Sequence, residues 1–182
     1  MNNRFTDNPR YTATAKGLHW LMALMIFGLL ALGFYMTDLP LSPQKLQYYS
    51  WHKWAGMSVF ALVWLRLAWR ITHRPPTLSD RLSPAMQWAA HGGHFLLYAL
   101  MVVIPVSGWV MSSAKGVPTV WFGVLPLPDL VGKDKELGDN LAELHEALNV
   151  GLLLLISGHA LAALWHHFAH RDDTLRRMLP WR

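Results

Sequence analysis

The 182-residue chain contains no cysteine and unusually little charge. Without cysteine it can form no disulfide, supply no thiolate to an iron–sulfur cluster and offer no C-x-x-C-H site for covalent haem. Charged residues make up 15% of the chain, whereas a soluble domain carries about 25%. The sequence also lacks a G-x-G-x-x-G, P-loop or H-E-x-x-H motif, an internal repeat and a low-complexity segment. It therefore does not fit a soluble nucleotide-binding enzyme or a zinc protease.

What the chain does have is apolar and aromatic sequence, with 53% hydrophobic residues and ten tryptophans. Four segments are long enough to cross a hydrocarbon layer of about 30 Å as helices. We predict an all-α membrane protein in which residues 1–182 form one four-helix transmembrane bundle. The expected spans are residues 18–37, 51–70, 85–111 and 141–169.

The ends of the expected spans carry local signals. Asp38, Pro40 and Pro43 follow the first span where a signal peptide would have a small-residue cleavage site, so we expect this span to stay uncleaved. Asn140 with Glu143 three residues later resembles a capping box. We therefore expect the fourth helix to begin at about residue 141.

Lysine and arginine are distributed unevenly between the two sides of the predicted bundle. The net charge of +5 is not gathered in one patch, which disfavours a nucleic-acid partner. The side with both termini holds eleven basic residues and the other side five, so both termini are expected in the cytoplasm. The eleven are Arg4, Arg10, Lys16, Arg66, Arg70, Arg74, Arg81, Arg171, Arg176, Arg177 and Arg182, and the five are Lys45, Lys53, Lys115, Lys133 and Lys135.

Four histidines sort into two layers by depth. His145 and His159 lie fourteen residues apart, which on a helix is about 21 Å of rise and roughly 40° short of four full turns. With alternating helix directions, His52 falls at the outer level with His145, and His19 falls at the inner level with His159. Two imidazoles facing each other are typical axial ligands of haem iron. We predict two haems, non-covalent and hence b-type because cysteine is absent.

Other interpretations of the histidines remain open. Histidines in spans often only hydrogen-bond between helices, and a metal-transport site is a further alternative. The spacing of His91 with His94, and of His166 or His167 with His170, would suit chelation, but their roles are left open. His166 follows His159 by seven residues, so it lies near the same helix face and about 10 Å closer to the cytoplasm. An imidazole there could donate protons to a quinone.

Five segments of the chain together form a recognisable pattern: GLHWLMALM, WHKWAG, AAHGGHFLLYALMVVIPVSGW, LHEALNVG and SGHALAALWHHFAHRDDTLRRMLP. From about residue 11 to residue 180 the chain resembles the bacterial cytochrome b561 family. The resemblance implies a small four-helix protein of the bacterial inner membrane with two haems b. It also implies that the histidines matching His19, His52, His145 and His159 ligate the haems and that the one matching His166 contacts quinone.

The implied activity is oxidation of superoxide at the periplasmic side, with ubiquinone as the electron acceptor. Lys53, next to His52, is placed to attract the superoxide anion, although the outer loops carry five basic and seven acidic residues in all. The first alternative is an electron-carrier subunit serving a separate dehydrogenase or hydrogenase, and the second is a metal transporter or other non-redox protein. Expected partners are membrane lipid, quinone and superoxide or another periplasmic donor, and the oligomeric state is left open.

Overall fold

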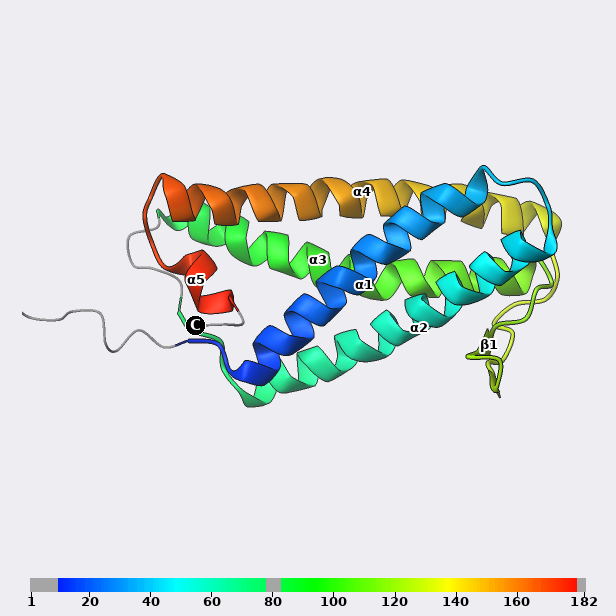
Figure 1. The fold of residues 1–182 in the computed structure, drawn as a ribbon, viewed down its shortest axis with the longest axis horizontal. Helices are drawn as coiled ribbons and strands as arrows, with labels where there is room; N and C mark the ends of the chain where they lie inside the picture. The colour runs from blue at the N-terminus through cyan, green and yellow to red at the C-terminus, as the bar shows by residue number, and fades with distance from the viewer. Residues whose placement is uncertain (1–9, 78–82, 180–182) are drawn as a thin grey trace, which may run out of the picture.

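A computed structural model describes residues 10–77 and 83–179 of the chain. Four long helices dominate the molecule, with a short antiparallel hairpin between the third and fourth and one helical turn and a half near the C-terminus (Figure 1). The elements are α1 (Ala13–Thr37), α2 (Pro43–Thr72), α3 (Pro84–Ala114), β1 (Val120–Trp121), β2 (Leu125–Pro126), α4 (Lys135–Phe168) and α5 (Thr174–Met178).

Each long helix begins at a side-chain cap. Thr12, Ser42, Ser83 and Asp134 each accept a hydrogen bond from a backbone amide three residues further on, which satisfies one otherwise unpaired donor. The capping box expected at residues 140 and 143 is therefore wrong, because α4 begins at Lys135. The helices extend beyond the expected spans, since hydropathy marks only the part of a helix suited to hydrocarbon while backbone hydrogen bonding continues into polar turns.

All four long helices are apolar enough to cross a membrane. Large apolar side chains project outward from them, including Leu24 at 70% exposure, Phe95 at 71% and Leu154 at 69%. Such exposure would be costly in water but suits a surface covered by lipid tails. The predicted four-helix membrane bundle is confirmed. Of the residues used to predict its orientation, Arg4, Arg81 and Arg182 lie outside the described residues.

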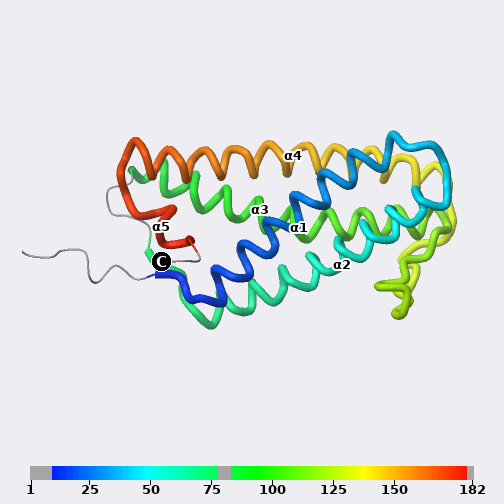
Figure 2. The backbone as a smooth tube through the Cα atoms, in the orientation of Figure 1, coloured from blue at the N-terminus to red at the C-terminus, as the bar shows by residue number. Residues whose placement is uncertain are grey.

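The bundle has two distinct ends, which Figure 2 shows clearly. The described chain begins and ends at one of them, together with α5, and we call this the terminal end. The opposite end carries the β1–β2 hairpin and the turn from α1 to α2, and we call it the hairpin end. His19 and His159 belong to the terminal end, and His52 and His145 to the hairpin end.

The long helices pack in sequence order, α1 on α2, α2 on α3 and α3 on α4. The helix pairs α1–α4 and α2–α4 are not among the closely packed ones. A small apolar core lies between the helices and includes Met22, Val63, Ile104 and Leu152. Helix α2 is thus held opposite α4 mainly through α3, and α1 is held there through α2 and α3. Neither α1 nor α2 packs closely on α4 itself.

The hairpin is fastened to the first turns of α2. The Trp54 indole donates a hydrogen bond to the Val120 carbonyl at 2.7 Å, and the Trp121 indole donates to the Trp54 carbonyl at 3.2 Å. The turn uses two successive residues with positive φ, Phe122 at 51° and Gly123 at 70°. Glycine adopts this region freely, which allows the tight reversal. The hairpin is therefore fixed against α2 at this end of the bundle.

We expect Met22→Ala to lower the free energy of unfolding by roughly 2–5 kcal/mol, because it opens a cavity in the core. Met22 is 1% exposed, and Leu24 on the same helix is 70% exposed and serves as the control. Leu24→Ala should change stability much less. Thermal unfolding in detergent, followed by helical circular dichroism, measures both, and equal losses in the two variants would contradict this core.

Candidate functional site

Two pairs of imidazoles face each other across the bundle. At the terminal end the ring centroids of His19 on α1 and His159 on α4 are 6.3 Å apart. At the hairpin end the centroids of His52 on α2 and His145 on α4 are 6.4 Å apart. Helix α4 contributes one ring to each pair. The structure thus brings the four sequence-predicted histidines together in the two layers that their depths indicate.

The spacing within each pair suits a metal ion between the rings. Two bonds of about 2.0 Å from a metal to imidazole nitrogens place the ring centroids roughly 6 to 6.5 Å apart. Both pairs have this separation. Helix α4 does not pack closely on α1 or on α2, the helices that bear the rings facing it. The residues present therefore fit a metal-centred group ligated from two helices.

Three of the four rings form no hydrogen bond that joins helices in the described part of the chain. Within the described part of the chain, the imidazoles of His19, His52 and His159 make no hydrogen bond to another residue, and the buried Nδ1 of His52 has no partner. A buried polar atom left without a partner costs about 1–3 kcal/mol. For His52, this cost fits a binding role better than a purely structural one.

His145 is oriented by two residues of α3. The Ser107 hydroxyl donates to the Ile104 carbonyl at 2.8 Å, so its oxygen accepts from Nδ1–H of His145 at 2.9 Å. This arrangement leaves Nε2 with its lone pair free to bind a metal. The ring also lies against Gly108, where an added Cβ would be 3.0 Å from its Cε1. Neither Ser107 nor Gly108 was identified from the sequence, since both are ordinary residues of a membrane helix.

A third imidazole lies beside the terminal-end pair. The His94 ring centroid is 5.4 Å from that of His159, which is closer than either opposed pair. The Nδ1 of His94 is 2.7 Å from the carbonyl of Ala90 and donates to it. His94 is thus a third histidine beside the terminal-end pair, closer to His159 than His19 is. His91 lies on the exposed side of the same helix, with Nδ1 on the Gln87 carbonyl.

His166 forms a pair with a carboxylate that sequence reasoning missed. Its Nδ1 is 2.7 Å from Asp172, and both side chains are largely buried. Burial alone would raise the pKa of Asp172, but hydrogen bonds from Thr174 and His166 outweigh it and lower the pKa below the ordinary 3.8. Asp172 therefore stays ionised and holds His166 in one orientation. The available signal was the spacing of Asp172 and Thr174 in the closing motif.

Lys53 is held by the loop that precedes the hairpin. Its Nζ donates to the carbonyls of Val117 and Pro118 at 3.2 and 3.3 Å. The side chain is only half-buried, so its charge still acts on the space around the hairpin end. Lys53 thus joins α2 to the loop at the level of His52, the neighbouring residue in sequence.

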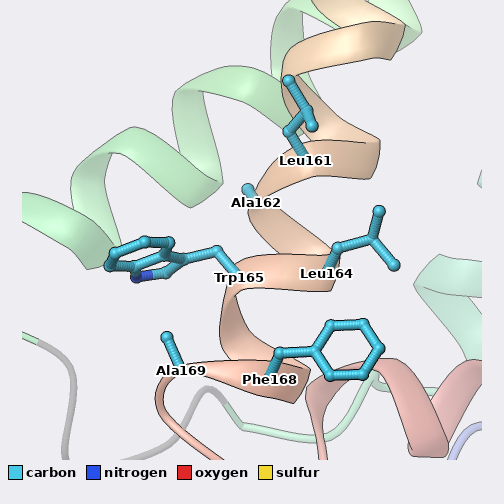
Figure 3. A pocket seen from close by; sticks show the side chains of 6 residues that line it. All are labelled: Leu161, Ala162, Leu164, Trp165, Phe168 and Ala169. Carbon is cyan, nitrogen blue, oxygen red and sulfur yellow. The ribbon is translucent and has the colours of Figure 1, made fainter.

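The surface formed by the last turns of α4, from Leu161 to Ala169, is shallow and apolar. Figure 3 shows Leu164 and Phe168 on one side of α4 and Trp165 on the other, so these side chains fan out around the helix. Such a surface suits contact with hydrocarbon chains. Nowhere in residues 10–77 and 83–179 do three or more metal-binding side chains gather into a chelating cluster. Neither His91 with His94 nor the histidines after His159 form such a site.

A multi-pass helical bundle with opposed imidazole pairs defines the class of membrane cytochromes b. A sequence profile described as prokaryotic cytochrome b561 matches residues 10–181, and the chain belongs to this family. It is therefore a membrane electron-transfer cytochrome that binds haem b.

Individual relatives agree with the family. The chain is 34% identical to Cytochrome b561 homolog 2 of Escherichia coli, over 96% of this chain and 94% of that protein. It is 28% identical to a protein of Yersinia pestis named Probable superoxide oxidase CybB, over 95% of this chain and 97% of that protein. Cytochrome b561 homolog 1 of Escherichia coli is 31% identical over 72% of this chain and 74% of its own length.

We expect Gly108→Ala to destabilise the protein, although alanine is normally the better helix residue. The new Cβ would lie 3.0 Å from His145 and displace its ring, whereas a Cβ at Gly28 would meet nothing within 4 Å. Gly28→Ala should stabilise α1 by about 0.5–1 kcal/mol. Melting temperatures of the two variants test this difference, and equal gains in both would show that His145 does not depend on the glycine.

Proposed function

We propose that the protein is a di-haem b oxidoreductase that carries electrons across the bacterial inner membrane. His19 with His159 would hold one haem, and His52 with His145 the other. The observation that carries this proposal is the pair of imidazole separations, 6.3 and 6.4 Å, between rings of which three have no hydrogen bond to the described chain. Bound haem would supply reversible one-electron transfer at each pair.

The protein's own part is to fix and shield these sites. Ser107 sets the tautomer of His145, and Gly108 admits its ring close to α3. The hairpin is fixed against the outer end of α2 through Trp54. Burial and hydrogen bonding of axial ligands are the means by which a protein sets haem potential.

We propose superoxide as the electron donor at the hairpin end, which we expect in the periplasm because the other end carries more lysine and arginine. Each superoxide loses one electron and leaves as dioxygen. The support is the relative named Probable superoxide oxidase CybB, together with Lys53, whose half-exposed ammonium lies beside His52 on the sequence. A cation at the entrance raises the local concentration of an anionic substrate.

We propose ubiquinone as the acceptor near His166 at the cytoplasmic side. Two superoxides supply the two electrons for one quinone, and two protons from the cytoplasmic side complete the quinol. His166 directs Nδ1–H at Asp172, so it would take up a second proton at Nε2 from the cytoplasmic side and, as an imidazolium, pass that proton to a quinone oxygen. The apolar surface of Leu164 and Phe168 would contact the quinone's hydrocarbon tail.

A second candidate is an electron-carrier cytochrome b subunit that serves a separate donor enzyme. It would need the same haems and the same quinone site near His166. A donor protein docked at the hairpin end would replace superoxide as the source of electrons. The relative named Probable superoxide oxidase CybB favours the first candidate.

We expect His145→Ala to bind one haem per chain instead of two, because it removes one ligand from the hairpin-end pair only. The pyridine haemochrome assay gives haem type and number. His91→Ala is the matched control, since His91 is an exposed histidine on the same bundle, and it should keep both haems. Two haems in His145→Ala would refute the ligand pairing, and no b-type haem in the unaltered protein would refute the whole proposal.

We expect superoxide to reduce the haems rapidly and ubiquinone to reoxidise them in stopped-flow absorbance. His166→Ala should slow only the quinone-dependent phase, by about 10²-fold or more if His166 acts as a proton donor. Asp172→Asn should slow it less, because the imidazole remains but is less well oriented. Haem reduction only by an added donor protein would favour the carrier subunit, and unaltered reoxidation in His166→Ala would remove the quinone assignment.

A further inference from the structure

A group of arginines at the terminal end has no role in the function above. Arg66 and Arg70 lie one helical turn apart on α2, so they share one face. Both are half-buried, and with Arg10 and Arg74 they line one pocket between α2, α3 and the start of the described chain. Four guanidinium groups therefore surround one pocket, and none of its described lining residues contributes a carboxylate.

These guanidinium groups lack acceptors. Within residues 10–77 and 83–179, neither Arg66 nor Arg70 forms an ion pair or donates a hydrogen bond to another residue. Their only contact of this kind is with the Tyr98 ring, whose centroid is 5.6 Å from Arg66 and 5.9 Å from Arg70. Each guanidinium has five donors, and like charges one turn apart repel. A bound oxyanion would satisfy the donors and relieve the repulsion.

Nearby acidic groups are already engaged elsewhere. Asp172 is bonded to His166, and Asp173 is paired with Arg177 at 2.9 Å. The described carboxylates at this end therefore leave the arginine pocket with an uncompensated positive charge. In a membrane protein that charge needs a counterion, and residues 10–77 and 83–179 do not supply one.

The pocket is adjacent to the terminal-end imidazole pair. Arg66 interacts electrostatically with His19, His94 and His159. Arg66 also follows His52 by fourteen residues, the same interval that separates His145 from His159 on α4. On a helix this interval places Arg66 at the level of the terminal-end pair. Arg66 is thus within the reach of a group held between His19 and His159.

We propose that Arg66 and Arg70 form an oxyanion site at the terminal end that binds a carboxylate or phosphate in bidentate fashion. Two sources share this chemistry. One is a propionate carboxylate of the haem that His19 and His159 would hold. This source rests on the proposed function, and the position of Arg66 favours it. The other is the phosphate of an anionic lipid at the membrane surface, which is independent of any haem.

The test compares Arg66→Gln and Arg70→Gln with Arg176→Gln. Arg176 is an exposed arginine of α5 at the same end, which makes it a matched control for charge. All variants are purified as full chains, and circular dichroism and the haemochrome assay establish that helix content and haem number are retained. Arg70→Lys keeps the charge but not the planar fork, so it separates bidentate binding from simple attraction.

The carboxylate source is tested by redox-difference infrared spectra of protein loaded with haem labelled with ¹³C at its propionates. The labelled band should move in Arg66→Gln and Arg70→Gln, move partly in Arg70→Lys, and stay in place in Arg176→Gln. The same two glutamine variants should lower the midpoint potential of one haem.

The phosphate source is tested in nanodiscs of phosphatidylglycerol and of phosphatidylcholine. Stabilisation by phosphatidylglycerol that disappears in Arg70→Gln, with unchanged haem bands, would assign the site to lipid phosphate. Loss of a charge-assisted hydrogen bond should weaken that binding about tenfold or more. If both glutamine variants match Arg176→Gln in both assays, the oxyanion site is overturned. Failure of the unaltered protein to bind haem would instead refute the proposed function and leave the lipid test intact.

Discussion

The opposition of imidazoles across the bundle is the constraint on which the rest of the structure depends. Helix α4 supplies one ring to each pair, so α1 and α2 must present His19 and His52 to the same face of α4 at two depths. A helix can meet this demand only if its two histidines are close to a whole number of turns apart. The fourteen-residue interval between His145 and His159 meets it.

The packing follows from the same requirement. Helices that approach closely over their whole length would leave no room between facing rings. In this bundle α3 packs on α4 and α2 packs on α3, while α1 packs on α2, so the ring-bearing helices are held near α4 through intermediaries. Small residues serve the rings locally, as Gly108 does for His145 and Gly33 for His52. The apolar core is correspondingly small and lies between the two histidine layers.

The two ends of the bundle differ in chemistry. At the hairpin end, indole and ammonium groups are bonded to backbone carbonyls, so polar side chains are used to fasten the hairpin. At the terminal end, Asp172 orients His166, while Arg66 and Arg70 donate to no acceptor within the described residues. The hairpin end thus uses its polar side chains to join segments of the chain, and the terminal end holds polar side chains without a described protein acceptor.

The sequence alone determined the number of membrane helices and the depth of each histidine, because hydrocarbon thickness and helical rise are fixed quantities. It did not determine where α4 begins, since a polar helical turn before a span leaves no trace in hydropathy, and the expected capping box was wrong. Only the tertiary structure decided which residues contact the rings. Ser107 lies on His145, His94 lies closer to His159 than His19 does, and Asp172 folds back onto His166, because helix rotation and chain reversal set these contacts. Such rotations depend on the packing of all helices at once, which no local pattern encodes.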